Sequence, residues 1–168
     1  DLLFLSRSDT GKWSLCHDPV ELDTLLLQIY ENFQPIVKES RKSLSLELPD
    51  QSLPQVLGDS QRISQAVAVL LDNACTYTPD GGAIRLGLRH QHHELQIYVA
   101  DSGPGIPDQE KEKVFDRFYR SDPSRSRKDH YGLGLSIARE IAELHHGRIL
   151  VLDGAEGGAE LVLCLPLP

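Results

Sequence analysis

Apolar residues recur every three or four positions in three stretches of the chain, and this spacing predicts three amphipathic helices. The predicted helices span residues 20–38, 60–76 and 133–145. Asp18 and Pro19 precede the first helix and Asp59 precedes the second, which are the positions expected of N-terminal capping residues. Pro35 is expected to bend or end the first helix.

Elsewhere apolar and polar residues alternate, and this pattern predicts strands with one buried face. The predicted strands span residues 13–18, 43–48, 83–89, 94–100, 148–152 and 159–165, with a short extended piece at 55–57. Residues 90–93 and 154–158 are predicted as turns of two hairpins, and residues 108–116 as a short helix. These elements predict an α+β fold: a two-layer α/β sandwich in which one mixed, mostly antiparallel sheet is packed on one face by about three helices.

The composition is that of a globular domain, with 40% hydrophobic and 25% charged residues among 168. A net charge of −8 argues against a nucleic-acid-binding surface, which would be basic. The three cysteines are far apart, which favours free thiols in a reducing cytosol over a disulfide framework or a zinc site. The three histidines within residues 90–93 are expected to lie at a solvated hairpin tip rather than around a metal.

The chain contains no run of eighteen apolar residues, so no membrane contact is expected from it. It opens within a predicted helix, residues 1–8, and without a starting Met, so we expect a piece of a longer protein. The expected location is the cytoplasm, although the parent protein could be anchored in the inner membrane through another segment.

Residues 99–107 are the first candidate for chemistry. An apolar strand delivers Asp101 into a loop that holds two glycines and two prolines within residues 103–107. Glycine allows close approach of the backbone to a ligand, and proline stiffens the loop. An ordinary turn after a strand would give the same local pattern, so this stretch alone leaves both interpretations open.

Two further features suggest a site for a polyphosphate with a metal ion. Asn73 is polar beside the apolar face of its helix, and its amide oxygen is a ligand type that Mg²⁺ prefers. Gly132 and Gly134 open the last helix, where bare amides and the helix dipole favour an anion, and the basic loop at 120–128 precedes them. The alternatives are an asparagine that caps a neighbouring loop and a solvated charged loop.

The order of these motifs resembles the ATP-binding catalytic domain of bacterial sensor histidine kinases, within the GHKL (Bergerat-fold) ATPases. Residues 70–74 with 77–82 resemble the N box of that family, 101–105 the G1 box, 114–120 the F box and 132–138 the G2 box. Residues 157–160 with 165–166 resemble the closing hairpin. The resemblance covers nearly the whole chain from about Ser14, and four boxes in order make it specific.

The resemblance implies a site for ATP and Mg²⁺. Asp101 would accept a hydrogen bond from the adenine amino group, Asn73 would coordinate Mg²⁺, and Arg120 would stabilise charge at the γ-phosphoryl group. Asn73 and Arg120 would thus be the catalytic residues, and residues 121–131 a lid over the nucleotide. The implied nucleotide-binding residues are Asn73, Tyr77, Asp101, Gly103, Gly105, Ile106, Tyr119, Arg120, Gly132, Leu133, Gly134 and Leu135.

The resemblance also implies partners. Residues 1–10 would be the end of the second helix of a dimerisation and phosphoacceptor domain, and residues 11–168 the catalytic domain. The acceptor histidine would lie in the missing part of a homodimeric parent, and a response regulator would receive the phosphoryl group. His17 is rejected as acceptor because Pro19 would break the helix that the family requires. The fragment is therefore expected to bind ATP but not to phosphorylate itself.

Three other functions are alternatives to this one. An ATP-driven clamp needs a catalytic glutamate upstream of Asn73, where Val67, Ala68 and Val69 stand instead. A GHKL serine kinase is disfavoured by the F box at 115–118 and by the long lid. A degenerate docking module stays open, because Thr76 stands where the family usually has a basic residue. In addition, His130 and Tyr131 stand where the family usually has a glycine followed by Thr or Ser. Val69 and Ala159 depart from the family pattern as well.

Overall fold

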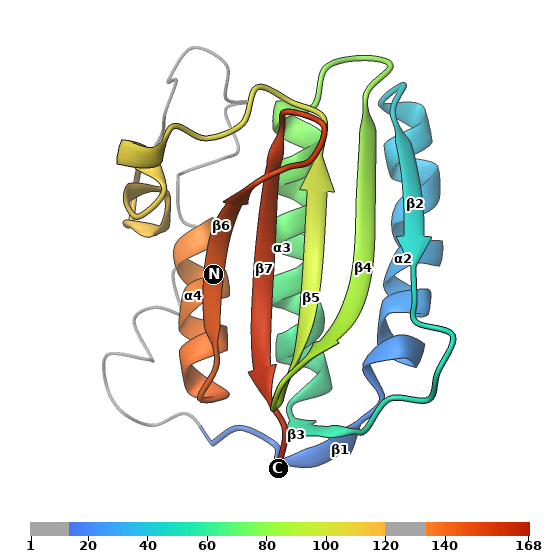
Figure 1. Cartoon of the computed structure of the whole chain (residues 1–168), viewed down its shortest axis with the longest axis vertical. Coiled ribbons are helices and arrows are strands. Elements are labelled where there is room, and N and C mark those ends of the chain that lie inside the picture. The colour runs from blue at the N-terminus through green and yellow to red at the C-terminus, as the bar shows by residue number, and fades with distance from the viewer. Residues whose placement is uncertain (1–13, 120–133) are drawn as a thin grey trace.

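The computed structural model describes residues 14–119 and 134–168, and these residues form two layers. One layer is a five-stranded sheet, and the helices α2, α3 and α4 cover one of its faces (Figure 1). The strands are β2 (Ser43–Glu47), β4 (Ala83–Gln91), β5 (Glu94–Asp101), β6 (Arg148–Asp153) and β7 (Ala159–Pro166). Their order is β2-β4-β5-β7-β6, and only the pair of β2 and β4 is parallel. The predicted α+β two-layer fold is confirmed.

The helices are α2 (Leu22–Glu39), α3 (Ser60–Tyr77) and α4 (Gly134–Leu144). α3 begins as predicted, because one oxygen of the Asp59 carboxylate accepts hydrogen bonds from the backbone N–H groups of Gln61 and Arg62, both at 3.1 Å. α2 continues past Pro35 to Glu39, so this proline does not end the helix.

The start of α2 differs from the prediction. Asp18 and Pro19 belong to a short strand, β1 (Asp18–Val20), which pairs antiparallel with β3 (Val56–Gly58) in a separate two-stranded sheet. The helix begins only at Leu22, and Glu21 at its N-cap makes no side-chain capping hydrogen bond. Local capping rules failed here because β3, the strand with which these residues pair, lies far along the chain. Proline is tolerated in a strand at a sheet edge.

Two smaller predictions also need correction. Residues 108–116 form two separate 3₁₀ turns, η1 (Asp108–Glu110) and η2 (Lys113–Phe115), instead of one helix. Phe115 of the second turn is buried in the core, which gives this turn its own anchor. β4 extends to Gln91, so the first hairpin turn is reduced to two residues, with His92 in the left-handed region at φ 55°.

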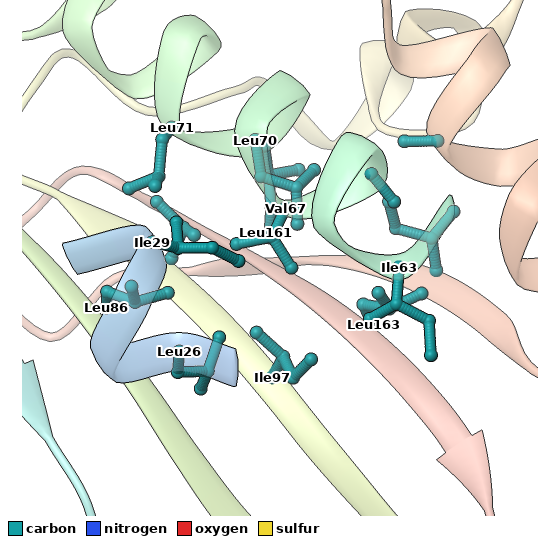
Figure 2. Packing of buried hydrophobic residues seen from close by; sticks show 14 of the residues in the cluster. Leu26, Ile29, Ile63, Val67, Leu70, Leu71, Leu86, Ile97, Leu161 and Leu163 are labelled. Atoms are coloured by element: carbon teal, nitrogen blue, oxygen red, sulfur yellow. The ribbon is translucent and has the colours of Figure 1, made fainter. Parts of the chain in front are cut away.

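The core lies between the sheet and the helices, as Figure 2 shows for residues of α2, α3, β4, β5 and β7. Leu26 of α2 and Leu70 of α3 are fully buried, as is Ile97 of β5. Burying a side chain of this size contributes about 1.5–3 kcal/mol relative to exposure. No helix within residues 14–119 and 134–168 is long and apolar enough to cross a membrane.

A buried histidine joins the C-terminal end of α4 to the N-terminal end of α3. His145 is 5% exposed, and its Nε2 accepts a hydrogen bond from the backbone N–H of Asp59 at 3.0 Å. Its Nδ1 lies 2.8 Å from the carbonyl oxygen of Ile141, which can only accept, so Nδ1 is the nitrogen that donates. A Cβ at Gly58 would lie only 2.7 Å from the ring, so the contact requires glycine there.

Replacing this side chain is expected to destabilise the domain. His145→Ala leaves the Asp59 N–H without its partner and removes the side-chain hydrogen bond to the Ile141 carbonyl oxygen, which keeps the one from the backbone N–H of residue 145. Together with the cavity that forms, this should lower the free energy of unfolding by about 2–4 kcal/mol. For a domain of this size the melting temperature should fall by roughly 5–12 °C, measured by thermal unfolding. His90→Ala, at an exposed position of β4, is the matched control and should melt within about 1 °C of the wild type. Equal melting of both variants would contradict a structural role for His145.

Candidate functional site

The last residue of β5 places a carboxylate at the edge of the sheet. The Asp101 side chain is buried, with the residue 7% exposed. Its Oδ1 accepts hydrogen bonds from the backbone N–H groups of Gly103 at 2.8 Å and Ala159 at 3.4 Å. Among the residues that the structure describes, Oδ2 accepts none, so one oxygen is fixed and the other is available to a ligand.

Burial also affects the protonation of this carboxylate. Desolvation raises the pKa of Asp101 above its ordinary value, and the hydrogen bonds from Gly103 and Ala159 oppose the rise. A carboxylate that is buried at a free energy cost, with only one oxygen satisfied by the protein, is more typical of a binding site than of a structural turn. The interpretation of residues 99–107 as an ordinary turn is therefore disfavoured.

Three glycines let other backbone segments approach this carboxylate closely. A Cβ at Gly158 would lie 1.8 Å from the Asp101 carbonyl oxygen, and one at Gly103 would lie 2.7 Å from the Tyr77 carbonyl oxygen. Gly105 has φ +77°, and a Cβ there would lie 3.2 Å from the carbonyl oxygen of Gly157. The loop after β5 is thus packed between the end of α3 and the turn of the β6–β7 hairpin, near which it also passes in Figure 1.

α3 carries two of the predicted site residues, Asn73 and Tyr77. Both are partly exposed, and the Asn73 amide makes no hydrogen bond with the residues described. The next residue, Thr78, is 2% exposed, and its hydroxyl finds no hydrogen-bond partner within the described part of the chain. Buried polar atoms are nearly always paired in proteins, so this hydroxyl marks a position suited to a polar ligand or a bound water. Sequence reasoning did not assign Thr78 to the site, because only burial distinguishes it from an ordinary capping threonine.

The F box is anchored on α4. Phe115 is buried in the core, and the Arg139 guanidinium of α4 lies 5.9 Å from the centre of its ring. Tyr119 follows η2, and desolvation together with a hydrogen bond to the Glu110 side chain raises the pKa of its phenol. Phe118, between them, is 65% exposed and has φ 66°.

α4 begins at Gly134 and contributes a close contact with α3. A Cβ at Gly134 would lie 3.3 Å from the Val69 side chain, and Leu135 packs against the core. The remaining predicted residues Arg120, Gly132 and Leu133 lie outside the described residues. The same holds for the basic loop and lid at 120–131, with His130 and Tyr131, and for residues 1–10. Their assignments stay predictions.

The structure also contains a surface hollow of about 590 Å³ beside this loop. Glycine backbone from the loop and from the β6–β7 turn forms much of its wall, together with Ile106, Glu110 and Asp153. Of the predicted nucleotide-binding residues, Gly105 and Ile106 line it, whereas Asn73, Tyr77 and Asp101 do not, so the hollow meets the predicted nucleotide site only at this loop. Within the described ranges no group of three or more His, Cys, Asp or Glu side chains could hold a metal ion, the hairpin histidines included.

Comparison with known sequences matches most of the chain to one family. The model of the family described as "Histidine kinase-, DNA gyrase B-, and HSP90-like ATPase" matches residues 58–168. The sensor histidine kinase TmoS of Ectopseudomonas mendocina is 38% identical over 169 residues, and the adaptive-response sensory kinase SasA of Rippkaea orientalis is 33% identical over 168. Both alignments cover 99% of this chain but only 17% of TmoS and 42% of SasA, so the chain spans less than half of these relatives.

Solved structures share the fold. The catalytic domain of histidine kinase ThkA superposes with a TM-score of 0.78 at 28% identity, covering 92% of this chain and 96% of that one. The mycobacterial sensor histidine kinase MprB superposes with a TM-score of 0.74 at 31% identity, covering 89% of this chain and 97% of MprB. Full-length ShkA in complex with AMPPNP superposes with a TM-score of 0.86 at 25% identity, covering 98% of this chain and 34% of ShkA.

Proposed function

Because the chain belongs to the family of histidine kinase-, DNA gyrase B- and HSP90-like ATPases, we propose that it is the ATP-binding catalytic domain of a sensor histidine kinase. In the whole protein it would donate the γ-phosphoryl group of Mg-ATP to a histidine on a separate dimerisation domain. A response-regulator aspartate would then receive the phosphoryl group. The observation that carries the proposal is the Asp101 carboxylate, buried with one oxygen held by backbone and the other available.

Asp101 selects adenine through the direction of one hydrogen bond. The two backbone N–H groups orient the carboxylate, so that Oδ2 presents only an acceptor. The exocyclic amino group of adenine is a donor and matches it, whereas guanine offers a carbonyl oxygen at the same position. Ile106 would pack against the base. The complex of the similar ShkA with AMPPNP supports an adenine nucleotide as ligand.

The residues present also fit Mg²⁺ at the phosphate end. The partly exposed Asn73 amide makes no hydrogen bond with the described residues, so its oxygen is available as a ligand. A single neutral protein ligand suits Mg²⁺, which shares its remaining positions among phosphates and water. When bound, Mg²⁺ supplies positive charge that offsets the phosphates. Tyr119, Arg120 and the start of α4 would bind the phosphates, and Arg120 would stabilise charge at the transferred group.

One observation favours a second candidate function, a nucleotide-binding docking module without phosphoryl transfer. The hydroxyl of Thr76, which stands where the family has a basic residue, donates a hydrogen bond to the Asp72 carbonyl oxygen at 2.9 Å. The side chain is thus directed to its own helix and supplies no cation to a phosphate. Weak binding of the phosphates would leave adenine recognition intact while abolishing transfer.

Titration of the chain with Mg-ATP and with adenosine tests the proposal. Asn73→Ala is expected to weaken Mg-ATP binding about tenfold, corresponding to about 1.4 kcal/mol, and to leave adenosine binding unchanged. Calorimetry or fluorescence titration measures both affinities. Asn32→Ala, at an exposed position of α2, serves as matched control and should bind both ligands as the wild type does.

Extension of the chain by its natural upstream helices tests phosphoryl transfer itself. The longer protein should form an acid-labile, alkali-stable phosphohistidine from γ-labelled Mg-ATP, and Asn73→Ala should abolish it. A wild-type chain that binds no Mg-ATP would overturn the kinase proposal. Binding without phosphohistidine in the longer protein would favour the docking module.

A further inference from the structure

Lys111 joins the loop that follows β5 to the β6–β7 hairpin. Its Nζ lies 2.6 Å from Oδ1 of Asp108 and 2.8 Å from Oδ1 of Asp153. The lysine side chain is 20% exposed, whereas the two carboxylates are 87% and 76% exposed. Asp108 is three residues away in the same segment, but Asp153 is the last residue of β6. The second ion pair therefore connects two separate parts of the chain.

The hairpin holds the other end of the same loop. Asp153 is the register partner of Ala159 on β7, and the Ala159 N–H donates a hydrogen bond to Oδ1 of Asp101. Residues 101–111 thus contact one hairpin at both ends, through Asp101 at the first residue and Lys111 at the last. Gly105 in the middle lies against the turn of that hairpin as well.

We propose that Lys111 is a positioning residue for nucleotide binding: its ion pair with Asp153 holds residues 101–111 against the β6–β7 hairpin. The proposal rests on the proposed function, since the loop carries Asp101, Gly105 and Ile106. With the bridge formed, the loop is held in its binding conformation before the nucleotide arrives. Without it, the loop keeps its contacts with the hairpin at Asp101 and Gly105 and its anchor further on at Phe115, but its last residues lose their ion pair with the hairpin and must also be ordered on binding.

The expected effect is modest, because the carboxylates are exposed and ion pairs of this kind are screened by salt. Lys111→Ala should weaken binding of ATP and of uncharged adenosine by the same factor, about three- to tenfold. Equal effects on both ligands separate loop positioning from attraction between the lysine and the phosphates, which would weaken ATP binding alone.

Titration calorimetry of the whole chain with adenosine and with Mg-ATP, at 0.05 M and 0.5 M NaCl, tests the proposal. Asp153→Asn should reproduce the loss, and the double variant should lose no more than either single one. Lys111→Arg should retain wild-type affinity. High salt should weaken adenosine binding to the wild type but not to Lys111→Ala. Thermal unfolding checks that every variant is folded.

The remote bidentate pair of Arg148 and Glu94, at 2.7 and 3.0 Å, supplies the control. Arg148→Ala should leave both affinities unchanged. Wild-type adenosine affinity in Lys111→Ala, or a loss confined to ATP, would overturn the positioning role while leaving the proposed function intact. A wild-type chain that binds neither adenosine nor ATP would overturn both.

Discussion

The Asp101→Asn variant is expected to bind ATP about 100 times more weakly than the wild type and to unfold at an equal or higher temperature. The Asn oxygen would take the place of Oδ1 and accept the N–H groups of Gly103 and Ala159. The amide NH₂ would then face the adenine amino group, so a donor would meet a donor. The variant loses a hydrogen bond to a charged acceptor and leaves a buried polar group unpaired in the complex. Together these two effects should weaken the binding free energy of ATP by about 2.7 kcal/mol.

The stability of this variant follows from the direction of the pKa shift. Burial raises the pKa of Asp101 in the folded chain, so the folded state binds its proton more tightly than the unfolded state does. Stability from this group is therefore lost as pH rises from the unfolded pKa through the raised folded one, and the carboxylate destabilises the fold at neutral pH. An amide carries no charge to desolvate. The advantage of Asp101→Asn in thermal unfolding should be largest at pH 7 and shrink as the pH is lowered.

Asp50→Asn is the matched control, because Asp50 is an exposed carboxylate in the turn after β2. It should alter neither ATP affinity nor the melting temperature by a measurable amount. If Asp101→Asn bound ATP as the wild type does, the adenine site would have to lie elsewhere. If it unfolded at a much lower temperature, the carboxylate would serve the fold and not a ligand.

The fold could be predicted from the sequence wherever the determining interactions are local. The helix α3 is the clearest case: Asp59 caps it, and its apolar residues recur at helical spacing over eighteen residues. The error at Asp18 and Pro19 has the opposite cause. Their strand pairs with residues about forty positions away, and no local signal reports such a partner.

The same distinction applies to the site. Asp101 could be predicted because a carboxylate between a strand and a glycine-rich loop is visible in the sequence. The N–H group of Ala159 could not, because every residue except proline carries one and only the fold brings this one to Asp101. The role of Lys111 could not be predicted from the sequence either, since its partner Asp153 lies 42 residues away and a surface lysine has no distinctive pattern.

Gly158→Ala is expected to affect both the fold and the site. A Cβ at this position would lie 1.8 Å from the Asp101 carbonyl oxygen and 2.7 Å from its Oδ1. The backbone at Gly158 or Asp101 must therefore move. This should lower the free energy of unfolding by about 2–4 kcal/mol and the melting temperature by roughly 5–12 °C. Because the displaced groups are those that orient the carboxylate, we expect ATP affinity of the variant that remains folded to fall at least about tenfold in titrations at 10 °C.

A comparison with Gly157→Ala, at the neighbouring position, distinguishes this steric effect from backbone strain. Gly157 has φ +88°, but among the described residues, its two chain neighbours aside, no heavy atom lies within 4 Å of where its Cβ would be. Gly157→Ala should therefore cost only about 1–2 kcal/mol for the left-handed conformation and leave ATP affinity within about twofold of the wild type. Equal losses of affinity in both variants would mean that the hairpin turn as a whole, and not the contact of Gly158 with Asp101, sets the position of the carboxylate. A loss confined to Gly158→Ala would tie adenine recognition to this one backbone contact, which only glycine permits.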